Sequence, residues 1–534
     1  MFDAAQRRTG IYEMRRVLNL LIPLLLALTP ACRRVPPVET AQPPAARPNI
    51  LWVVWDTVRR DHLSVYGYER PTTPRVEQWA RGARVFTNCI SAGSTTVPAH
   101  VSMFTGLLPY QHGAHNRRPA IVQGARTLAE LLAREGYDTY LYSANPYIAR
   151  DKAVTRGFDT VEHPWDDQYR ADAVRLITAK IDPRDQSTEL AQRVHAGDTA
   201  DMPVVKAGKL AQTAVRRWID QRDNRKPYFI FLNYMEAHRP FLPAREYREM
   251  FLSPEQLERS YRLDRTWPAV WAYTFGVRDY SAEELAIFVG LYDAALRELD
   301  ELFGDLIASL DKRGMLDDTI VILTADHGEH LGDHHLLDHQ YSVYNELLYV
   351  PLIVHYPPAF APGRDQRPVM NFDLYPTLLQ LAGVTPPSNP KIGISYSLNL
   401  RDVPARRRRL AEYPQWMPAG LRRVREVAPD FDPTPWRRSL RGFYSGSHKL
   451  IWASDGRHEL YDLASDPHEQ HNLAPQNESR VRAMLDELKA AFDIQNRGRA
   501  GPSPQSPSQA EMKRLEALGY AAPGEDNGAD EPPP

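Results

Sequence analysis

Short apolar runs that each end in a polar side chain constrain the fold of this chain most. The run Asn49–Trp55 is followed by Asp56, and the run Thr319–Thr324 is followed, after one alanine, by Asp326 and His327. Short β-branched runs of this kind predict buried strands. Ligands of open α/β sheets collect beyond the carboxyl ends of the strands. We therefore expect Asp56, Asp326 and His327 to converge on one point.

Two more strands and a long helix extend this pattern. Apolar strands are predicted at Tyr137–Ser143 and Pro227–Tyr234. Ser281 and Glu284 form a capping box, after which apolar residues recur at helical spacing until Gly314. A helix in this place is the crossover that a parallel strand pair needs. The sequence therefore predicts an α/β fold.

A hydroxyl residue, Thr96, lies two residues before Pro98. Proline can open a helix at its first position, so we place Thr96 at a helix start. There its oxygen would meet the positive end of the helix dipole and unpaired backbone N–H groups, a setting that favours an alkoxide or a bound oxyanion. Threonine is also an ordinary N-cap residue, and this position alone does not identify a nucleophile.

Six motifs lie in order along the chain. They are Asp56-Thr57, the turn from Thr96 to Gly106, His238-Arg239-Pro240-Phe241, Asp326-His327-Gly328-Glu329, Val350-Pro351-Leu352-Ile353-Val354, and Glu459-Leu460-Tyr461-Asp462-Leu463 with Asp466-Pro467 and Asn472-Leu473. With these motifs the chain resembles the sulfatase branch of the alkaline phosphatase superfamily. The resemblance runs from about Pro48 to Leu473, with Tyr520 as a further candidate position. It implies an alkaline-phosphatase-like fold: a mixed, mostly parallel sheet sandwiched by helices, with a small C-terminal α+β subdomain.

The departures from the family pattern are as informative as the matches. Thr96 stands where sulfatases carry a Cys or Ser that is oxidised to formylglycine, and His100 stands where they carry Arg. Thr57 replaces the second Asp of the first strand, and Asp326-His327 replaces an Asp-Asn pair. Threonine cannot be oxidised to that aldehyde, so no formylglycine is expected. These changes resemble the phosphodiesterase and the phosphoethanolamine- or glycerophosphate-transferase members of the superfamily.

A divalent metal is the expected cofactor. Asp56, Thr96, Asp326 and His327 are its candidate ligands. Because one ligand is an imidazole, we favour Zn or Mn over the Ca that suits an all-oxygen site. A second ion held by Glu236, His238 and His339 is an alternative.

The resemblance also suggests catalytic residues. His238 matches the family histidine that contacts the transferred group, and His339 stands where the family has a substrate-binding basic residue. We expect His339 or His238 to protonate the leaving oxygen, since the ordinary pKa of histidine lies nearest neutrality. His339 is favoured over His334 for this role. His330 and His335 are expected to be solvated loop histidines.

Three further residues are candidates for substrate binding. Asn145 lies where sulfatases place a Lys-x-His pair, which this chain lacks. His100 and Lys449 would complement the charge of the transferred group. Lys449 is assigned because it matches the family lysine of a C-terminal hairpin.

The N-terminus resembles a targeting signal. Met14-Arg15-Arg16 precedes an apolar run from Val17 to Leu28, too short for a membrane span but typical of a signal peptide. Cys32 follows a small residue, so residues 1–32 are predicted as a lipoprotein signal peptide with a lipid anchor at Cys32. This predicts the periplasm or outer membrane, with plain secretion as the alternative. The only other cysteine, Cys89, is expected to be a buried apolar residue.

The rest of the chain divides by composition. Residues 33–47 form a Pro/Ala-rich linker, 48–390 the catalytic domain, and 391–495 the C-terminal subdomain. Residues 496–534 are predicted to be a mostly disordered tail, with a short helix from Ala510 to Leu518.

The predicted function is metal-dependent hydrolysis or transfer of phosphate, phosphodiester or phosphonate esters through Thr96. The substrate would be a small molecule or a glycan- or lipid-linked ester. Lys and Arg number 65 against 67 Asp and Glu, so the charge balance gives no reason to expect nucleic acid as a partner. Two alternatives stay open: sulfate ester hydrolysis without formylglycine, and a surface lipoprotein without turnover.

Overall fold

The computed structural model describes residues 47–116, 118–199, 205–386, 399–414, 418–492 and 508–521. The predicted signal peptide, its Cys32 and nearly all of the predicted linker lie outside this part of the chain. Within the described residues, no helix is both long enough and apolar enough to cross a membrane. All of the described residues belong to one unit that spans residues 43–534.

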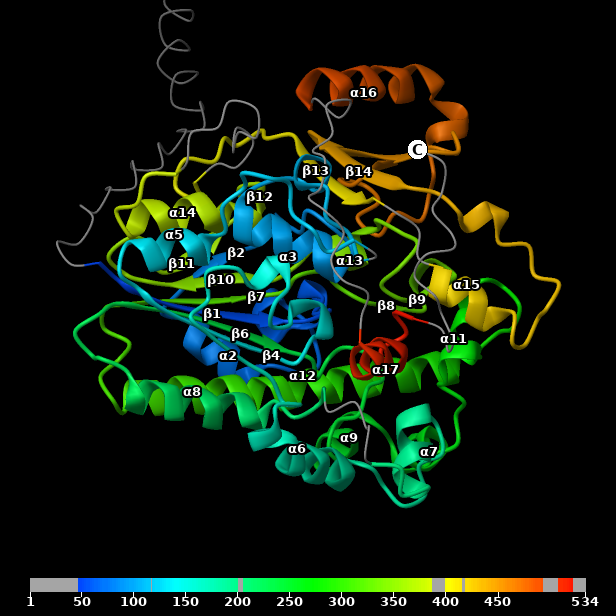
Figure 1. Ribbon diagram of the computed structural model, residues 1–534. Helices are drawn as coiled ribbons and strands as arrows, with labels where there is room; N and C mark the ends of the chain where they lie inside the picture. The colour runs from blue at the N-terminus through cyan, green and yellow to red at the C-terminus, as the bar shows by residue number, and fades with distance from the viewer. Residues whose placement is uncertain are drawn as a thin grey trace, which may run out of the picture. The chain divides into compact units, whose positions relative to one another are not determined.

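A single eight-stranded sheet lies at the centre of this unit (Figure 1). The strand order is β11-β2-β10-β7-β1-β6-β4-β5. The strands from β7 to β5 run parallel to one another, whereas β10 is antiparallel to both of its neighbours. The strands are β1 (Asn49–Trp55), β2 (Arg84–Phe86), β4 (Asp138–Ser143), β5 (Thr160–Glu162), β6 (Tyr228–Tyr234), β7 (Thr319–Thr324), β10 (Leu352–His355) and β11 (Gly363–Asp365). This mixed, mostly parallel sheet confirms the predicted fold class.

Helices cover both faces of the sheet. In Figure 1, α3, α5 and α14 lie above the sheet, and α8 and α12 lie below it. α2 packs against α12 and therefore belongs to the lower layer. The bounds of these helices are α2 (Pro74–Ala80), α3 (Thr96–Thr105), α5 (Leu128–Arg134), α8 (Lys209–Gln221), α12 (Ala282–Asp311) and α14 (Leu374–Leu381).

The long helix α12 begins and ends where the sequence predicts. The Ser281 hydroxyl accepts a hydrogen bond from the Glu284 N–H, and the Glu284 carboxylate accepts one from the Ser281 N–H. The chain then turns at Gly314, whose positive φ of 66° suits a residue without a β-carbon. α12 thus leads directly into β7, which pairs with β1 in parallel.

The remaining elements surround this sandwich. Two short ladders pair β3 (Cys89–Ile90) with β12 (Val369–Met370) and β8 (His330–Leu331) with β9 (Leu337–Asp338). Cys89 is buried, as predicted. Further helices are α4 (Pro109–His112), α6 (Asp167–Lys180), α7 (Glu189–His195), α9 (Arg245–Phe251), α10 (Pro254–Ser260), α11 (Trp267–Thr274), α13 (Asn345–Leu348) and α15 (Pro418–Val424).

A second, antiparallel sheet follows towards the C-terminus. Its order is β13-β14-β15-β16, and α16 (Glu478–Ala491) packs on β15. The predicted hairpin is present as β15 and β16. A separate apolar cluster, which includes Phe443, Leu450 and Leu488, fills the space between this sheet and its helix. The strands are β13 (Arg409–Tyr413), β14 (Leu440–Ser445), β15 (His448–Ala453) and β16 (Glu459–Asp462).

The region predicted as a mostly disordered tail contains a docked segment. Residues 508–521 form α17 (Gln509–Ala517), drawn in red in Figure 1, and a turn that leads to Tyr520. Only 4% of Tyr520 is exposed. Tyr520 therefore belongs to the folded body, whereas composition predicts that it lies in a mostly disordered tail.

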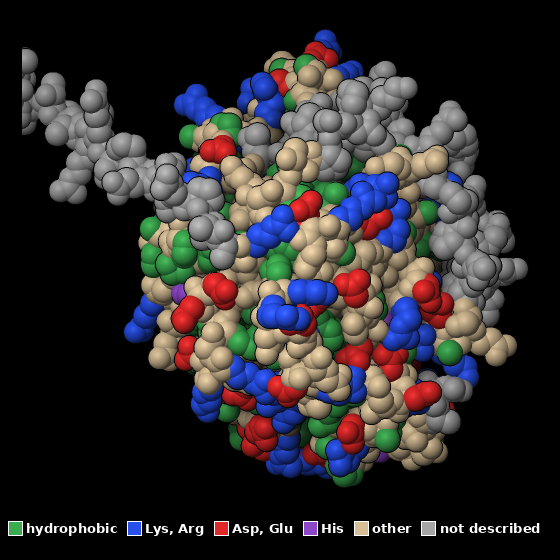
Figure 2. Space-filling view, turned by 60° about the vertical axis from the view of Figure 1, so that its left-hand side comes forward, with side chains coloured by type: hydrophobic (Ala, Val, Ile, Leu, Met, Phe, Trp, Pro, Cys, Tyr) green, Lys and Arg blue, Asp and Glu red, His purple; other side chains and the backbone are tan. Residues whose placement is uncertain are grey.

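Figure 2 shows one face of the molecule, on which acidic and basic side chains alternate over short distances. This face carries no broad area of a single charge. The pattern agrees with the formal net charge of −2 and offers no basic surface for a polyanion there.

Buried histidines make stability depend on pH, and His112 is the clearest case. Its Nδ1 accepts a hydrogen bond from the Ala114 N–H at 3.0 Å, and its Nε2 lies 3.1 Å from the Ser102 hydroxyl. Burial lowers the pKa of His112 from 6.5 to about 3. Because this pKa is depressed on folding, its contribution to stability is present above pH 6.5 and is lost as pH falls.

Between pH 7 and pH 5, the wild-type free energy of unfolding should fall by about 2 kcal/mol relative to that of His112→Gln. Urea unfolding of both proteins at the two pH values measures the difference. Equal pH dependence of the two proteins would show that His112 is protonated in the folded state.

Candidate metal and nucleophile site

Three ligand atoms meet beyond the carboxyl ends of two neighbouring parallel strands. Asp56 follows β1, while Asp326 and His327 follow β7. One ligand atom from each lies within 4.8 Å of the others, and all three side chains are fully buried. The arrangement predicted from the strand ends is therefore present.

Each carboxylate of this group has one oxygen held by the protein and one left open. Oδ2 of Asp56 accepts hydrogen bonds from the amides of Asn145 at 2.9 Å and Asn233 at 3.1 Å. Oδ1 of Asp326 accepts from the backbone N–H groups of Thr57 and His327 at 3.1 and 2.9 Å. The other oxygens, Oδ1 of Asp56 and Oδ2 of Asp326, have no hydrogen-bond partner.

The His327 ring likewise has one atom held by the protein and one left open. Its Nδ1 lies 3.0 Å from the carbonyl of Gly328 and so carries the proton, which leaves the lone pair on Nε2. This Nε2 has no hydrogen-bond partner and lies 3.2 Å from Oδ2 of Asp326. A backbone carbonyl that fixes the tautomer of a histidine is typical of metal ligands.

The electrostatics of the group also favour a cation. Burial raises the pKa of Asp56, although Asn145 and Asn233 oppose the shift. Burial, reinforced by the nearby Asp56, raises the pKa of Asp326 well above its usual range. Burial lowers the pKa of His327 well below 6.5. Two buried carboxylates and a neutral imidazole with open lone pairs fit a divalent metal, which would relieve these costs.

Thr96 is the first residue of α3, and Thr95 is the N-cap. The helix therefore begins two residues before Pro98, earlier than the proline rule alone suggests. The Thr96 side chain is fully buried, and its Oγ1 lies 3.1 Å from the hydroxyl of Tyr520. His100, one turn along, has Nδ1 3.5 Å from Oδ2 of Asp326, which brings the first turn of α3 to the ligand group.

Burial of His100 disfavours the charged ring that the resemblance implied. Its Nδ1 lies 3.0 Å from the carbonyl of Thr96, and burial lowers the pKa of His100 to about 4. The physical reason is that its ring packs among Phe104 and Phe231, away from water.

His238 lies in the loop after β6, and hydrogen bonds from Lys206 hold the backbone of this loop. The Lys206 ammonium, which is buried, donates to the carbonyls of Met235 and His238. The Nδ1 of His238 lies 2.6 Å from the carbonyl of Arg239, and its Nε2 lies 2.8 Å from the Tyr520 hydroxyl. Burial lowers the pKa of His238 well below 6.5. His238 is thus a neutral imidazole whose Nε2 accepts.

His339, unlike His238, favours the charged form of its ring. Its Nδ1 lies 3.1 Å from Oδ1 of Asp338 and 3.7 Å from Oε1 of Glu329 as an ion pair, and neither ring nitrogen makes a hydrogen bond of good geometry. Although burial disfavours the charged ring, the two carboxylates raise the pKa of His339 to about 9. The ring stacks on His327 at 4.6 Å between centroids and lies 5.0 Å from His238. An imidazolium beside the ligand group can supply a proton.

The alternative second-metal ligands do not form one cluster among the described residues, although the rings of His238 and His339 are neighbours. Oε1 of Glu236 accepts a hydrogen bond from the Gly208 N–H at 2.8 Å and lies 3.9 Å from the Lys180 ammonium, whereas its Oε2 has no hydrogen-bond partner. The second cluster of potential ligands among the described residues is Glu329, Asp338 and His339.

Two of the candidate substrate-binding residues have other partners. Asn145 donates to Asp56 and accepts from the Tyr147 N–H at 3.0 Å, so it supports a ligand carboxylate. Lys449 is buried, donates to the Val343 carbonyl and the Asn345 side chain, and pairs with Glu469 at 2.6 Å. These contacts use its three N–H groups and neutralise its charge, so we no longer assign Lys449 to the substrate.

The loop histidines also differ from expectation in one case. His330 is fully buried, and its Nε2 lies 2.7 Å from the Ser342 hydroxyl, so it is not solvated. The side chain of His335 is 48% exposed and pairs with Asp279, as a surface residue does. His334 lies 3.5 Å from Glu346 and stacks on Tyr344.

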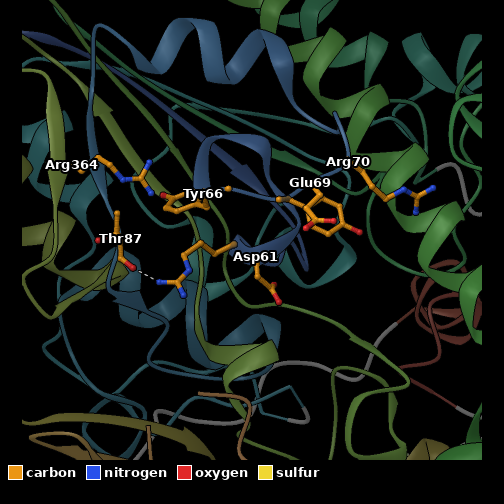
Figure 3. A pocket seen from close by; sticks show the side chains of 9 residues that line it. Asp61, Tyr66, Glu69, Arg70, Thr87 and Arg364 are labelled. Carbon is orange, nitrogen blue, oxygen red and sulfur yellow. Dashed lines mark hydrogen bonds between the residues drawn. The ribbon is translucent and has the colours of Figure 1, made fainter. Parts of the chain in front are cut away.

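A separate hollow of about 600 Å³ lies over the loop that follows β1 (Figure 3). Asp61, Tyr66 and Arg70 are among its lining residues, and none of the four metal-ligand candidates lines it. Asp61 is held there by the Arg59 guanidinium at 2.8 Å. The buried ligand group, in contrast, combines open ligand atoms with a nearby helix that begins at a hydroxyl residue.

Sequence reasoning missed Asn233 and Tyr520. Asn233 could have been found, because it is the polar residue inside the apolar run of β6. The resemblance extends to Tyr520 without giving it a role, and no local pattern links Tyr520 to Thr96.

The chain is similar to known proteins in both sequence and fold. The sulfatase family model matches residues 48–384. An N-acetylglucosamine-6-O-sulfatase of Bacteroides thetaiotaomicron is 23% identical over 85% of this chain and 87% of its own length. A multifunctional alkaline phosphatase superfamily protein of Trinickia caryophylli is 24% identical over 80% of this chain and 91% of its own. The phosphonate monoester hydrolase of Agrobacterium radiobacter has the same fold, with a TM-score of 0.64, 20% identity, and coverage of 84% of this chain and 96% of that chain.

Proposed function

Because this chain belongs to the sulfatase family, we propose that it is a metal-dependent hydrolase or transferase of phosphate, phosphodiester or phosphonate esters with Thr96 as nucleophile. The observation that carries the proposal is the set of open ligand atoms on Asp56, Asp326 and His327. His100, one turn after Thr96 in α3, lies 3.5 Å from Asp326 and so brings the start of this helix to the group. The names of the Trinickia relative and the Agrobacterium fold neighbour support phosphorus chemistry on this fold.

Thr96 and His339 have different roles in the proposed reaction. Thr96, held at the positive end of α3, attacks phosphorus and forms a covalent threonine ester. The His339 imidazolium protonates the leaving oxygen. Water or an acceptor alcohol then resolves the ester, which makes the protein a hydrolase or a transferase.

The metal site would be completed by Thr96 beside Asp56, Asp326 and His327. A divalent cation held there would lower the pKa of the Thr96 hydroxyl and polarise the substrate oxygen. The nitrogen ligand favours Zn or Mn over Ca.

Sulfate ester hydrolysis without formylglycine is the second candidate. The names of the Bacteroides relative and of a choline-sulfatase of Rhizobium meliloti favour it. The threonine at the nucleophile position weighs against it. A surface lipoprotein without turnover is the third candidate, and open ligand atoms beside a buried hydroxyl weigh against that.

We also propose a substrate class and a location. The relative from Bacteroides supports a small-molecule or glycan-linked ester as substrate. We place the protein in the periplasm or outer membrane, anchored through a lipid on Cys32. Metabolic labelling with a radioactive fatty acid, compared between wild type and Cys32→Ser, tests the anchor.

The proposed activity is tested with a panel of p-nitrophenyl esters and a count of bound metal. Turnover of phosphate, phosphate diester or phenylphosphonate esters is expected, with kcat/KM at least about a hundredfold above that for the sulfate ester. Cleavage of the sulfate ester alone would favour the second candidate. Bound metal with no turnover of any ester would favour the third.

His339→Gln should slow the turnover of an ester most when its leaving group needs a proton to depart. Turnover of an alkyl phosphodiester should fall about a hundredfold to a thousandfold, because the departing alkoxide loses its acid. The p-nitrophenyl ester should lose less than about tenfold, since p-nitrophenolate departs without protonation. Steady-state kinetics on both esters measure this, and His335→Gln, which lies at the surface, is the matched control. Equal losses on both esters would exclude His339 as the acid.

A further inference from the structure

The C-terminal segment 508–521 is docked by contacts from several parts of the fold. The Trp267 indole N–H of α11 donates to the Ala517 carbonyl at 3.0 Å. The guanidinium of Arg423 donates to the carbonyls of Glu516 at 3.0 Å and Ala521 at 3.4 Å. These contacts hold the turn after α17 from two sides and fix the direction in which Tyr520 enters the protein.

The Tyr520 side chain reaches two residues of the candidate site. Its hydroxyl lies 3.1 Å from Oγ1 of Thr96 and 2.8 Å from Nε2 of His238. Its ring packs 4.7 Å from that of Tyr147 and 5.7 Å from that of His339, measured between centroids. The hydroxyl therefore bridges the nucleophile and the histidine that follows β6.

The direction of these hydrogen bonds follows from the carbonyl beside His238. A carbonyl only accepts, so Nδ1 of His238 donates to Arg239, and the Nε2 of the neutral ring carries a lone pair. The Tyr520 O–H then donates to Nε2, and its oxygen is free to accept the proton of Thr96. The chain of donors runs from Thr96 through Tyr520 to His238.

We propose that Tyr520 is a catalytic residue that passes the proton of Thr96 to His238 during formation of the threonine ester. The inference rests on the proposed function, because it needs Thr96 as the nucleophile. As the bond from Oγ1 to phosphorus forms, the Thr96 proton moves to the Tyr520 oxygen and the Tyr520 proton moves to Nε2 of His238. The bond from phosphorus to the leaving oxygen breaks, and His339 gives that oxygen its proton.

The second half of the reaction reverses these transfers. Water attacks phosphorus and gives a proton to His339, while the bond from phosphorus to Oγ1 breaks. His238 returns its proton to Tyr520, and Tyr520 gives its own to the Thr96 oxygen. Every proton is restored, and the net reaction is hydrolysis of one ester bond.

The test compares wild type with Tyr520→Phe, which keeps the ring and removes only the hydroxyl. Enzyme in excess is mixed with a ³²P-labelled alkyl phosphodiester, quenched in acid and analysed for label on Thr96. The labelling rate should fall about tenfold to a hundredfold in Tyr520→Phe, as for loss of a hydrogen bond to a group that develops charge. Binding of inorganic phosphate should change less than about threefold.

Two controls separate chemistry from packing. Tyr375→Phe removes a hydroxyl that is equally buried and donates to the Arg126 carbonyl, and it should label at the wild-type rate. Amide hydrogen exchange in Gln509–Ala517 should match between wild type and Tyr520→Phe, which shows that α17 stays docked.

The fraction of the labelling rate lost in D₂O should be smaller in Tyr520→Phe, because one proton fewer moves.

Gly519→Ala moves Tyr520 without changing its hydroxyl. A β-carbon at Gly519 would lie 2.6 Å from the Trp267 ring, at a backbone φ of 73°. Its labelling rate should fall at least as far as that of Tyr520→Phe.

The two failures are distinguishable. Absence of label on Thr96 in wild type would overturn the proposed function. Labelling of Tyr520→Phe at the wild-type rate, with label on Thr96 in both proteins, would overturn only the role of Tyr520.

Discussion

Thr96→Ala is expected to lower kcat for phosphorus esters by at least about a thousandfold, because it removes the atom that forms the covalent intermediate. The variant should still bind metal, since Asp56, Asp326 and His327 retain their open ligand atoms. Kinetics with p-nitrophenyl phosphate esters and metal analysis by inductively coupled plasma mass spectrometry measure the two effects separately.

The neighbouring hydroxyl gives a matched control. Thr95 is the N-cap of α3, yet its side chain makes no capping hydrogen bond, so Thr95→Ala should retain kcat within about threefold. Thr96→Ser keeps a hydroxyl at the helix start and should retain more activity than Thr96→Ala. Full activity of Thr96→Ala would show that water attacks the ester directly and that Thr96 is only a helix residue.

The strand ends of the candidate site could be predicted from sequence because their signal is local. An apolar run of six or seven residues that ends in Asp specifies both a buried strand and the edge at which the carboxylate emerges. Parallel pairing of β1 with β7 then places Asp56 beside Asp326 without further information.

The partners of these ligands depend on contacts between distant parts of the chain. Lys449 matches a family position, but a buried Glu469 pairs with it, and no spacing in the sequence encodes that pair. His100 was expected to carry charge, yet the aromatic rings around it make the neutral form the stable one. The contact between Thr96 and Tyr520 spans 424 residues, beyond any periodic pattern.

Asp326→Asn is expected to abolish metal binding while stabilising the metal-free protein. In wild type, burial, reinforced by the nearby Asp56, raises the pKa of Asp326, so an ionised Asp326 costs free energy in the metal-free protein. The asparagine amide has no charge to bury, so the metal-free variant should have a higher Tm than metal-free wild type. The same change removes an anionic ligand, so bound metal should fall from about one ion per chain to below about a tenth.

Thermal unfolding with and without metal resolves the two effects. Metal at a thousand times its Kd stabilises a protein that binds it only when folded by about 4 kcal/mol, so wild type should gain Tm on metal addition. Asp326→Asn should gain none, and its kcat should fall at least about a thousandfold. Asp338→Asn, in the neighbouring cluster, should keep the metal-dependent gain in Tm. If Asp338→Asn lost that gain while Asp326→Asn kept it, the ion would be held by Glu329, Asp338 and His339, and Thr96 would have no metal to activate it.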